Sequence, residues 1–192
     1  MTSALPSSKP LPNKIWTSGN QTYVLHTILL TSGAANEEDT VISCLLNPSL
    51  IPLLPNPTFA QNMVVQGSTS YCVLPTPHKG FGMFATRDIP AGELIAIEHP
   101  ALILPAASLL EEAYNEIGLQ LPDKRRAELM AMANSRTIEE CPSPVEGIVR
   151  TNALALQLEF PKSMANDGLD AKLYGGVYPL LNRCNHRSLF FC

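Results

Sequence analysis

The chain has 192 residues and a formal net charge of −4, and 45% of its residues are apolar while 16% are charged. This is the composition of a globular protein with a sizeable core, and the acidic balance offers no electrostatic basis for direct nucleic-acid binding. No apolar stretch is long enough to cross a membrane and residues 1–14 lack the pattern of a secretory signal, so we expect a nuclear or cytoplasmic protein without choosing between the two.

Residues 1–68 differ in amino-acid composition from the rest of the chain. They contain seven prolines and clusters of Ser, Thr and Asn, with only short apolar runs. Residues 22–30 and 41–46 have the composition of strands, but neither run shows a sustained period. The sequence therefore predicts a proline-rich, poorly ordered leader over residues 1–68, followed by one domain over residues 69–192.

Three short strands are predicted at the start of this domain. Residues 71–74 have strand composition, and Gly80 and Gly82 form a turn that leads into a second strand. Residues 88–92 contain proline and glycine in the order that suits a tight turn, and residues 93–98 are predicted as a third strand. Short strands with regular turn signals favour an antiparallel β unit.

Helices are predicted after these strands. They cover residues 109–117, 124–133 and 148–158, and residues 172–192 close the chain with a Gly-Gly turn, an apolar run and a polar Asn-His pair. Ser108 and Glu111 fit a capping box at the start of the first helix. Continuing the apolar face of the second helix towards its start reaches Arg125 and Arg126, so its buried stripe is expected to be short.

Three short features have the residue types of a binding site, and each has an ordinary structural explanation as well. Gly80 and Gly82 let a ligand approach bare backbone, although most such glycine pairs only make a turn. The third glycine and the following helix of a dinucleotide site are missing. The Asn185-His186 pair is ordinarily a turn, and Asn152 within an apolar segment must in any case find hydrogen-bond partners.

Taken together, these features resemble the SET-domain family. Residues 79–95, KGFGMFATRDIPAGELI, with Glu98 after them, resemble the family's opening G-x-G-hydrophobic-F-A strand, its I-x-x-G-E-x-I turn and the acidic residue that follows. Residues 176–186, GVYPLLNRCNH, resemble the approach to the N-H-S-C-x-P-N motif. Residues 148–154 resemble the T-N-A element of the SET-and-MYND branch, although nothing upstream resembles a MYND finger. The likeness is collinear over residues 70–186.

The resemblance implies an α+β, β-rich SET fold of short strands with a helical insert at about residues 105–147. It also implies S-adenosylmethionine as cofactor and methylation of lysine in a protein substrate such as a histone. Seven residues would contact the cofactor: Lys79, Gly80, Phe81, Gly82, Asn152, Asn185 and His186. The backbone at residues 80–82 would line the methionine end, and the Asn-His pair would contact its amino and adenine parts.

The resemblance ends after His186. Arg187 and Ser188 stand where the family has serine and cysteine, and none of the five tyrosines lies where the catalytic tyrosine belongs. We therefore expect a truncated SET domain that is incomplete at the C-terminus and catalytically incomplete, with no catalytic residue assigned. The alternatives are a non-catalytic SET-derived interaction or regulatory module and a fragment that does not fold stably. The five cysteines show no CxxC spacing, which predicts free thiols and no metal site.

Overall fold

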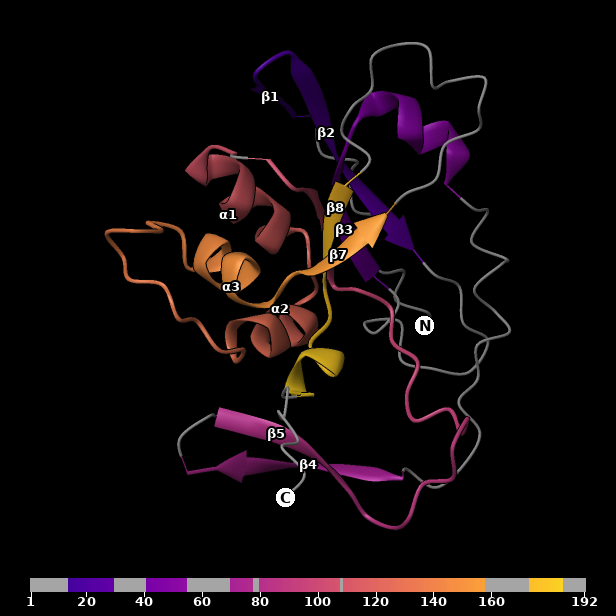
Figure 1. Ribbon diagram of the computed structural model, residues 1–192. Coiled ribbons are helices and arrows are strands. Elements are labelled where there is room, and N and C mark those ends of the chain that lie inside the picture. The colour runs from indigo at the N-terminus through magenta and orange to yellow at the C-terminus, as the bar shows by residue number, and fades with distance from the viewer. Residues whose placement is uncertain are drawn as a thin grey trace, which may run out of the picture.

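The computed structural model describes residues 14–29, 41–54, 70–77, 80–107, 109–157 and 173–184. These residues form a six-stranded sheet with the order β1-β2-β3-β6-β8-β7, a separate two-stranded hairpin and three α-helices (Figure 1). The predicted α+β class is therefore confirmed. The strands are β1 (Ile15–Ser18), β2 (Gln21–Leu29), β3 (Val41–Leu46), β4 (Tyr71–Thr76), β5 (Gly80–Ala85), β6 (Leu102–Pro105), β7 (Leu154–Gln157) and β8 (Leu173–Val177). The helices are α1 (Glu111–Leu119), α2 (Asp123–Met130) and α3 (Pro144–Asn152), with 3-10 helices η2 (Pro48–Leu53) and η5 (Leu181–Arg183).

One half of the large sheet, β1, β2 and β3, comes from the N-terminal quarter of the chain. β1, β2 and β3 form an antiparallel meander, and β3 pairs in parallel with β6 through Ser43 and Leu102. All six residues of β3 are buried. The strand predicted at residues 22–30 is confirmed as far as Leu29, and the strand predicted at residues 41–46 is confirmed in full. The described parts of the predicted leader, residues 14–29 and 41–54, are ordered. A strand covered on both faces reads as a continuous apolar run, which explains why β3 shows no period in the sequence.

The sheet carries a hydrophobic core on each face. On one face Leu45 packs in a cluster with Ile117 and other side chains of the three helices. On the other face Ile42, Leu50 and Tyr174 form a second cluster under η2. Figure 1 shows the three helices together on one side of the sheet. No helix within the described ranges is both long and apolar enough to cross a bilayer.

The β4–β5 hairpin lies apart from the large sheet, with η5 between the two (Figure 1). Its strands pair in register from Tyr71 opposite Ala85 to Thr76 opposite Gly80. At its tip the Thr76 hydroxyl donates to the Gly80 carbonyl at 2.9 Å, and Gly80 adopts a positive φ of 67°. A non-glycine residue would be strained there, so the sequence places glycine where the backbone requires it.

The predicted third strand, residues 93–98, is wrong. Residues 93–100 have no regular secondary structure. Glu93 instead folds back to pair with Arg87, and the Glu98 carboxylate accepts hydrogen bonds from the backbone of η5. The apolar run at residues 94–97 suits a strand, but these polar contacts hold the segment in place without a neighbouring strand.

The helix predictions need two corrections. α1 begins at Glu111 after an N-cap, Leu110, whose side chain makes no capping bond, and Ser108 lies outside the described residues. The helix predicted over residues 148–158 is instead two elements: α3 ends at Asn152, and residues 154–157 form β7, which pairs with β8. The chain leaves the helix at Ala153, where the backbone becomes extended, and gains ladder hydrogen bonds in place of helical ones.

Two further positions differ from expectation. The predicted Gly-Gly turn lies inside β8, where a Cβ on Gly176 would come within 2.7 Å of the Tyr178 ring. These glycines therefore serve close packing rather than a turn. In α2, Arg125 lies on the buried face beside Leu129 and is only 7% exposed. The short apolar stripe of this helix thus ends at a buried charge, not at solvent.

Candidate functional site

A cavity of about 610 Å³ lies where the hairpin meets the helices and η5, and we call it the hairpin cavity. Four chain segments supply its wall: the start of β5, the turn after α2, the end of α3 with the first residue of β7, and η5. The lining residues are Gly80, Phe81, Ala131, Met132, Ala133, Thr151, Asn152, Ala153, Leu154, Leu181, Asn182, Arg183 and Cys184. Segments far apart in the sequence therefore meet at one hollow.

Asn152 is held in place by its own side-chain amide. Nδ2 donates to the carbonyls of Ala133 and Ile148, each at 2.7 Å, so both of its hydrogens are used. Within the described part of the chain Oδ1 accepts no hydrogen bond. The side-chain amide of Asn152 therefore has the structural role expected of an amide in an apolar segment. Its Oδ1 is held in a fixed orientation and can accept a hydrogen bond from a ligand in the cavity.

Asn182 fastens η5 to the end of α3. Its Nδ2 donates to the backbone carbonyl of Asn152, and its Oδ1 accepts from the Tyr178 amide at 3.3 Å. Both ends of the Asn182 amide are thus engaged within the protein. This residue fixes the distance between two walls of the cavity.

Glu98 holds η5 from the other side. Its carboxylate accepts from the Leu180 amide at 2.9 and 3.0 Å and from the Leu181 amide at 2.7 Å. The Arg125 guanidinium lies 3.9 Å away and donates to the His99 carbonyl at 2.8 Å. Burial raises the pKa of Glu98, while the two backbone donors and Arg125 favour its ionised form. A largely buried carboxylate thus anchors the turn that carries Asn182 and Arg183.

Arg183 supplies the positive charge of the cavity. Its guanidinium carbon lies 5.3 Å from the centre of the Phe81 ring, Nε donates to the Pro179 carbonyl at 3.2 Å, and Nη2 reaches the Ala131 carbonyl at 3.5 Å. No carboxylate among the described residues lies within ion-pair distance of it. The Cys184 thiol beside it has its pKa raised by burial and by Glu98, which favours the neutral thiol. The described wall therefore has one cation and no anion.

The structure brings together some of the predicted site residues. Gly80, Phe81 and Asn152 all line the hairpin cavity. Gly82 lies in β5 opposite Leu74, is buried and does not line the cavity. The other three, Lys79, Asn185 and His186, lie outside the described residues.

Sequence reasoning missed Asn182, Arg183 and the turn after α2. Asn182 and Arg183 belong to the run at residues 176–186 that carries the resemblance, but site roles were assigned only to the final Asn-His pair. The change from the apolar pair Leu180-Leu181 to the polar pair Asn182-Arg183 could have indicated them. Nothing in the sequence indicated residues 131–133, because they enter the wall only through tertiary packing.

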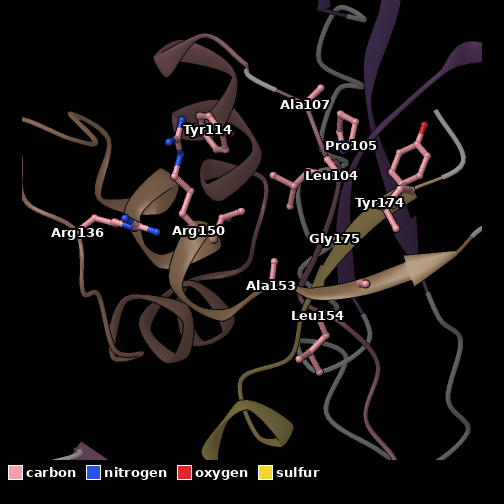
Figure 2. A pocket seen from close by; sticks show the side chains of 14 residues that line it. Leu104, Pro105, Ala107, Tyr114, Arg136, Arg150, Ala153, Leu154, Tyr174 and Gly175 are labelled. Atoms are coloured by element: carbon pink, nitrogen blue, oxygen red, sulfur yellow. The ribbon is translucent and has the colours of Figure 1, made fainter. Parts of the chain in front are cut away.

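A second cavity of about 560 Å³ lies between the helices and the β7–β8 edge of the sheet. Figure 2 shows Arg136 and Arg150 on its helical side and Leu104 and Tyr174 on its sheet side. Both arginines already have carboxylate partners, Glu140 at 3.8 Å and Glu146 at 2.7 Å. None of the predicted site residues lines this cavity, so we take the hairpin cavity as the candidate site.

The described side chains of the hairpin cavity can form hydrogen bonds with a ligand, pair with an anion and pack against apolar groups. Its described wall holds amides, a hydroxyl, a guanidinium, a thiol and apolar groups. No cluster of His, Cys, Asp and Glu able to hold a metal ion occurs among the described residues. Comparison with protein-family models, with curated proteins and with solved structures finds no match to this chain.

Proposed function

We propose that this chain is a SET-type domain that binds S-adenosylmethionine in the hairpin cavity, and that its activity is related to protein-lysine methylation. One observation carries the proposal. The resemblance assigns cofactor contacts to Gly80 and Phe81 in the hairpin and to Asn152 at the end of α3, and these distant segments line one cavity. If the likeness of residues 79–95 and of residues 148–154 to the family were accidental, the two motifs would have no reason to line the same cavity.

The composition of the wall also suits this cofactor. S-adenosylmethionine has a zwitterionic amino-acid end, a sulfonium centre and an adenosine, so it needs hydrogen-bond acceptors, a carboxylate partner and apolar surface. The cavity offers the free oxygen of Asn152, the guanidinium of Arg183 and the side chains of Met132 and Leu154. Its described wall has a single cation, Arg183, rather than the cluster of positive groups that is typical of a phosphate site.

Methyl transfer makes a separate demand on the protein. The acceptor amine must be neutral and in line with the methyl–sulfur bond.

A SET-derived binding module without transferase activity is the second candidate function. Arg187 and Ser188 favour it, because they replace the serine and cysteine that follow the Asn-His pair in the family's motif.

The first test is calorimetric titration of S-adenosylmethionine into the wild-type protein and two glycine variants. Gly80 and Gly92 both have positive φ, 67° and 87°, and a Cβ on either would meet no atom within 4 Å. Alanine therefore strains the backbone similarly at both positions, but only Gly80 lines the cavity. We expect Gly92→Ala to bind as the wild type does and Gly80→Ala to bind at least about tenfold more weakly. A folded wild-type protein that shows no binding would refute the proposed function.

A second assay separates the enzyme from the module. Transfer of a radiolabelled methyl group from S-adenosylmethionine to lysine-rich histone would be measured with the wild-type protein and with Gly80→Ala as the binding-deficient control. Transfer that is lost in the variant indicates a transferase. Cofactor binding without transfer indicates the non-catalytic module.

A further inference from the structure

Arg183 is a cation whose hydrogen-bonding capacity is only partly used. The Phe81 ring and the carbonyls of Pro179 and Ala131 fix its plane. Both donors of Nη1 and one donor of Nη2 have no protein partner among the described residues. The guanidinium is therefore held rigidly and still has an unused edge with the geometry that suits a carboxylate.

The carboxylates near Arg183 in the described part of the chain, Glu98 and Glu128, interact with other groups. Glu98 is occupied by two backbone amides of η5 and by Arg125, and no ion pair joins it to Arg183. Glu128 lies within 3.4 Å of the same Arg125 guanidinium. The contrast with the second cavity is direct, since Arg136 and Arg150 each have a carboxylate partner. Among the described residues, Arg183 is the one cavity-lining arginine that has no carboxylate partner.

The cavity thus has a positive donor and a free acceptor in one wall. Arg183 offers N–H groups, and Asn152 offers Oδ1, because its Nδ2 hydrogens are both used. An amino acid in its zwitterionic form presents the complementary pair, a carboxylate and an ammonium group. The sulfonium, by contrast, is repelled by a guanidinium, so a ligand containing both groups gains by turning its carboxylate towards Arg183.

We propose that Arg183 binds the carboxylate of the methionine end of S-adenosylmethionine and so sets the direction in which the cofactor enters the hairpin cavity. This inference rests on the proposed function. It assigns the cofactor's charged end to η5, at a residue that the resemblance did not single out. A charge-assisted pair of this kind discriminates strongly against a ligand without the carboxylate.

The test compares S-adenosylmethionine with its decarboxylated analogue, which keeps the sulfonium, the amine and the adenosine. Both ligands would be titrated into the wild type, Arg183→Met and the control Arg136→Met, with circular dichroism and melting curves to establish folding. We expect the wild type and Arg136→Met to prefer the complete cofactor by about tenfold or more, and Arg183→Met to bind the two ligands equally. The readout is the ratio of the two affinities. Loss of the contact with Phe81 would weaken the binding of both ligands alike, so it would leave this ratio unchanged.

A Lys79→Met variant provides the competing explanation, since Lys79 is the other cation assigned to the cofactor. If Lys79→Met abolishes the preference and Arg183→Met retains it, the inference is overturned while the proposed function stands. Equal affinities in the wild type would also overturn it. If the folded wild type binds neither ligand, the proposed function itself fails, and the inference with it.

Discussion

Replacing Glu98 with alanine tests the anchor of the candidate site. The Glu98 and Arg125 side chains are 9% and 8% exposed, so the substitution leaves a guanidinium buried without its carboxylate. It also removes the acceptor for the amides of Leu180 and Leu181. The N-terminal end of η5 then has no partner for its backbone donors, and the turn carrying Arg183 loses its fixed position.

The expected loss of stability is large for one residue. Breaking a buried pair by removing one partner costs about 3–5 kcal/mol. Arg125 keeps its bond to the His99 carbonyl and its contact with Glu128, so we expect a value near the lower end, about 3 kcal/mol. For a chain of this size, that corresponds to a decrease in melting temperature of roughly 6–12 °C.

Urea and thermal unfolding followed by circular dichroism would measure the effect, with Glu128→Ala as the matched control. Glu128 reaches the same guanidinium at 3.4 Å but is 38% exposed, so its removal should cost less than about 1 kcal/mol. The double variant Glu98→Met with Arg125→Met should recover the part of the loss that comes from the unpaired buried charge, but not the part that comes from the amides of Leu180 and Leu181. A loss for Glu98→Ala no greater than that of the control would refute the assignment of Glu98 as the anchor.

Three other predictions follow from single positions. Gly176→Ala should destabilise the protein by about 1–3 kcal/mol in urea unfolding, because the new Cβ would lie 2.7 Å from the Tyr178 ring; a neutral result would contradict the close packing of β8. Burial, and secondarily Arg125, lowers the pKa of His99 below its ordinary value of 6.5, so the unfolded state binds a proton at a higher pH than the folded state does. Stability should therefore fall as the pH falls from about 6.5 through the pKa of the folded state, and His99→Gln should lack that part of the loss. Urea midpoints that change with pH in the same way in both proteins would argue against this role of His99. Thiol labelling of the native protein should modify Cys184, which is exposed, and spare the fully buried Cys44 until unfolding; early labelling of Cys44 would count against the core position of β3.

Local elements with a clear composition could be predicted from the sequence. β3 coincides with the predicted residues 41–46, and β2 and the hairpin strands lie close to their predicted ranges. The partner of β3 could not be predicted, because an apolar run buried on both faces contains no signal for its neighbour. Its parallel pairing with β6 follows from packing over a long sequence distance.

The failures share a physical cause, which is that tertiary contacts decided between local alternatives. Residues 154–157 have apolar composition that suits a helix or a strand, and pairing with β8 determined the outcome. Arg125 looked like the end of an apolar stripe, but Glu98, distant in the sequence, stabilises it in the interior. Within the site, Gly80, Phe81 and Asn152 were predicted through the resemblance, whereas the wall contributed by the turn after α2 depends on how the helices pack.

The parallel pairing of β3 with β6 has a consequence for biosynthesis. The β1–β2–β3 meander uses only neighbouring residues, so a nascent chain can complete it early during translation. The edge of β3 that faces away from β2 has no pairing partner until residues 102–103 have left the ribosome. The second edge of β6 has no partner until β8 has been synthesised. Such high contact order predicts slow maturation with an unpaired, apolar strand edge exposed in the meantime, which is a natural point for chaperone binding.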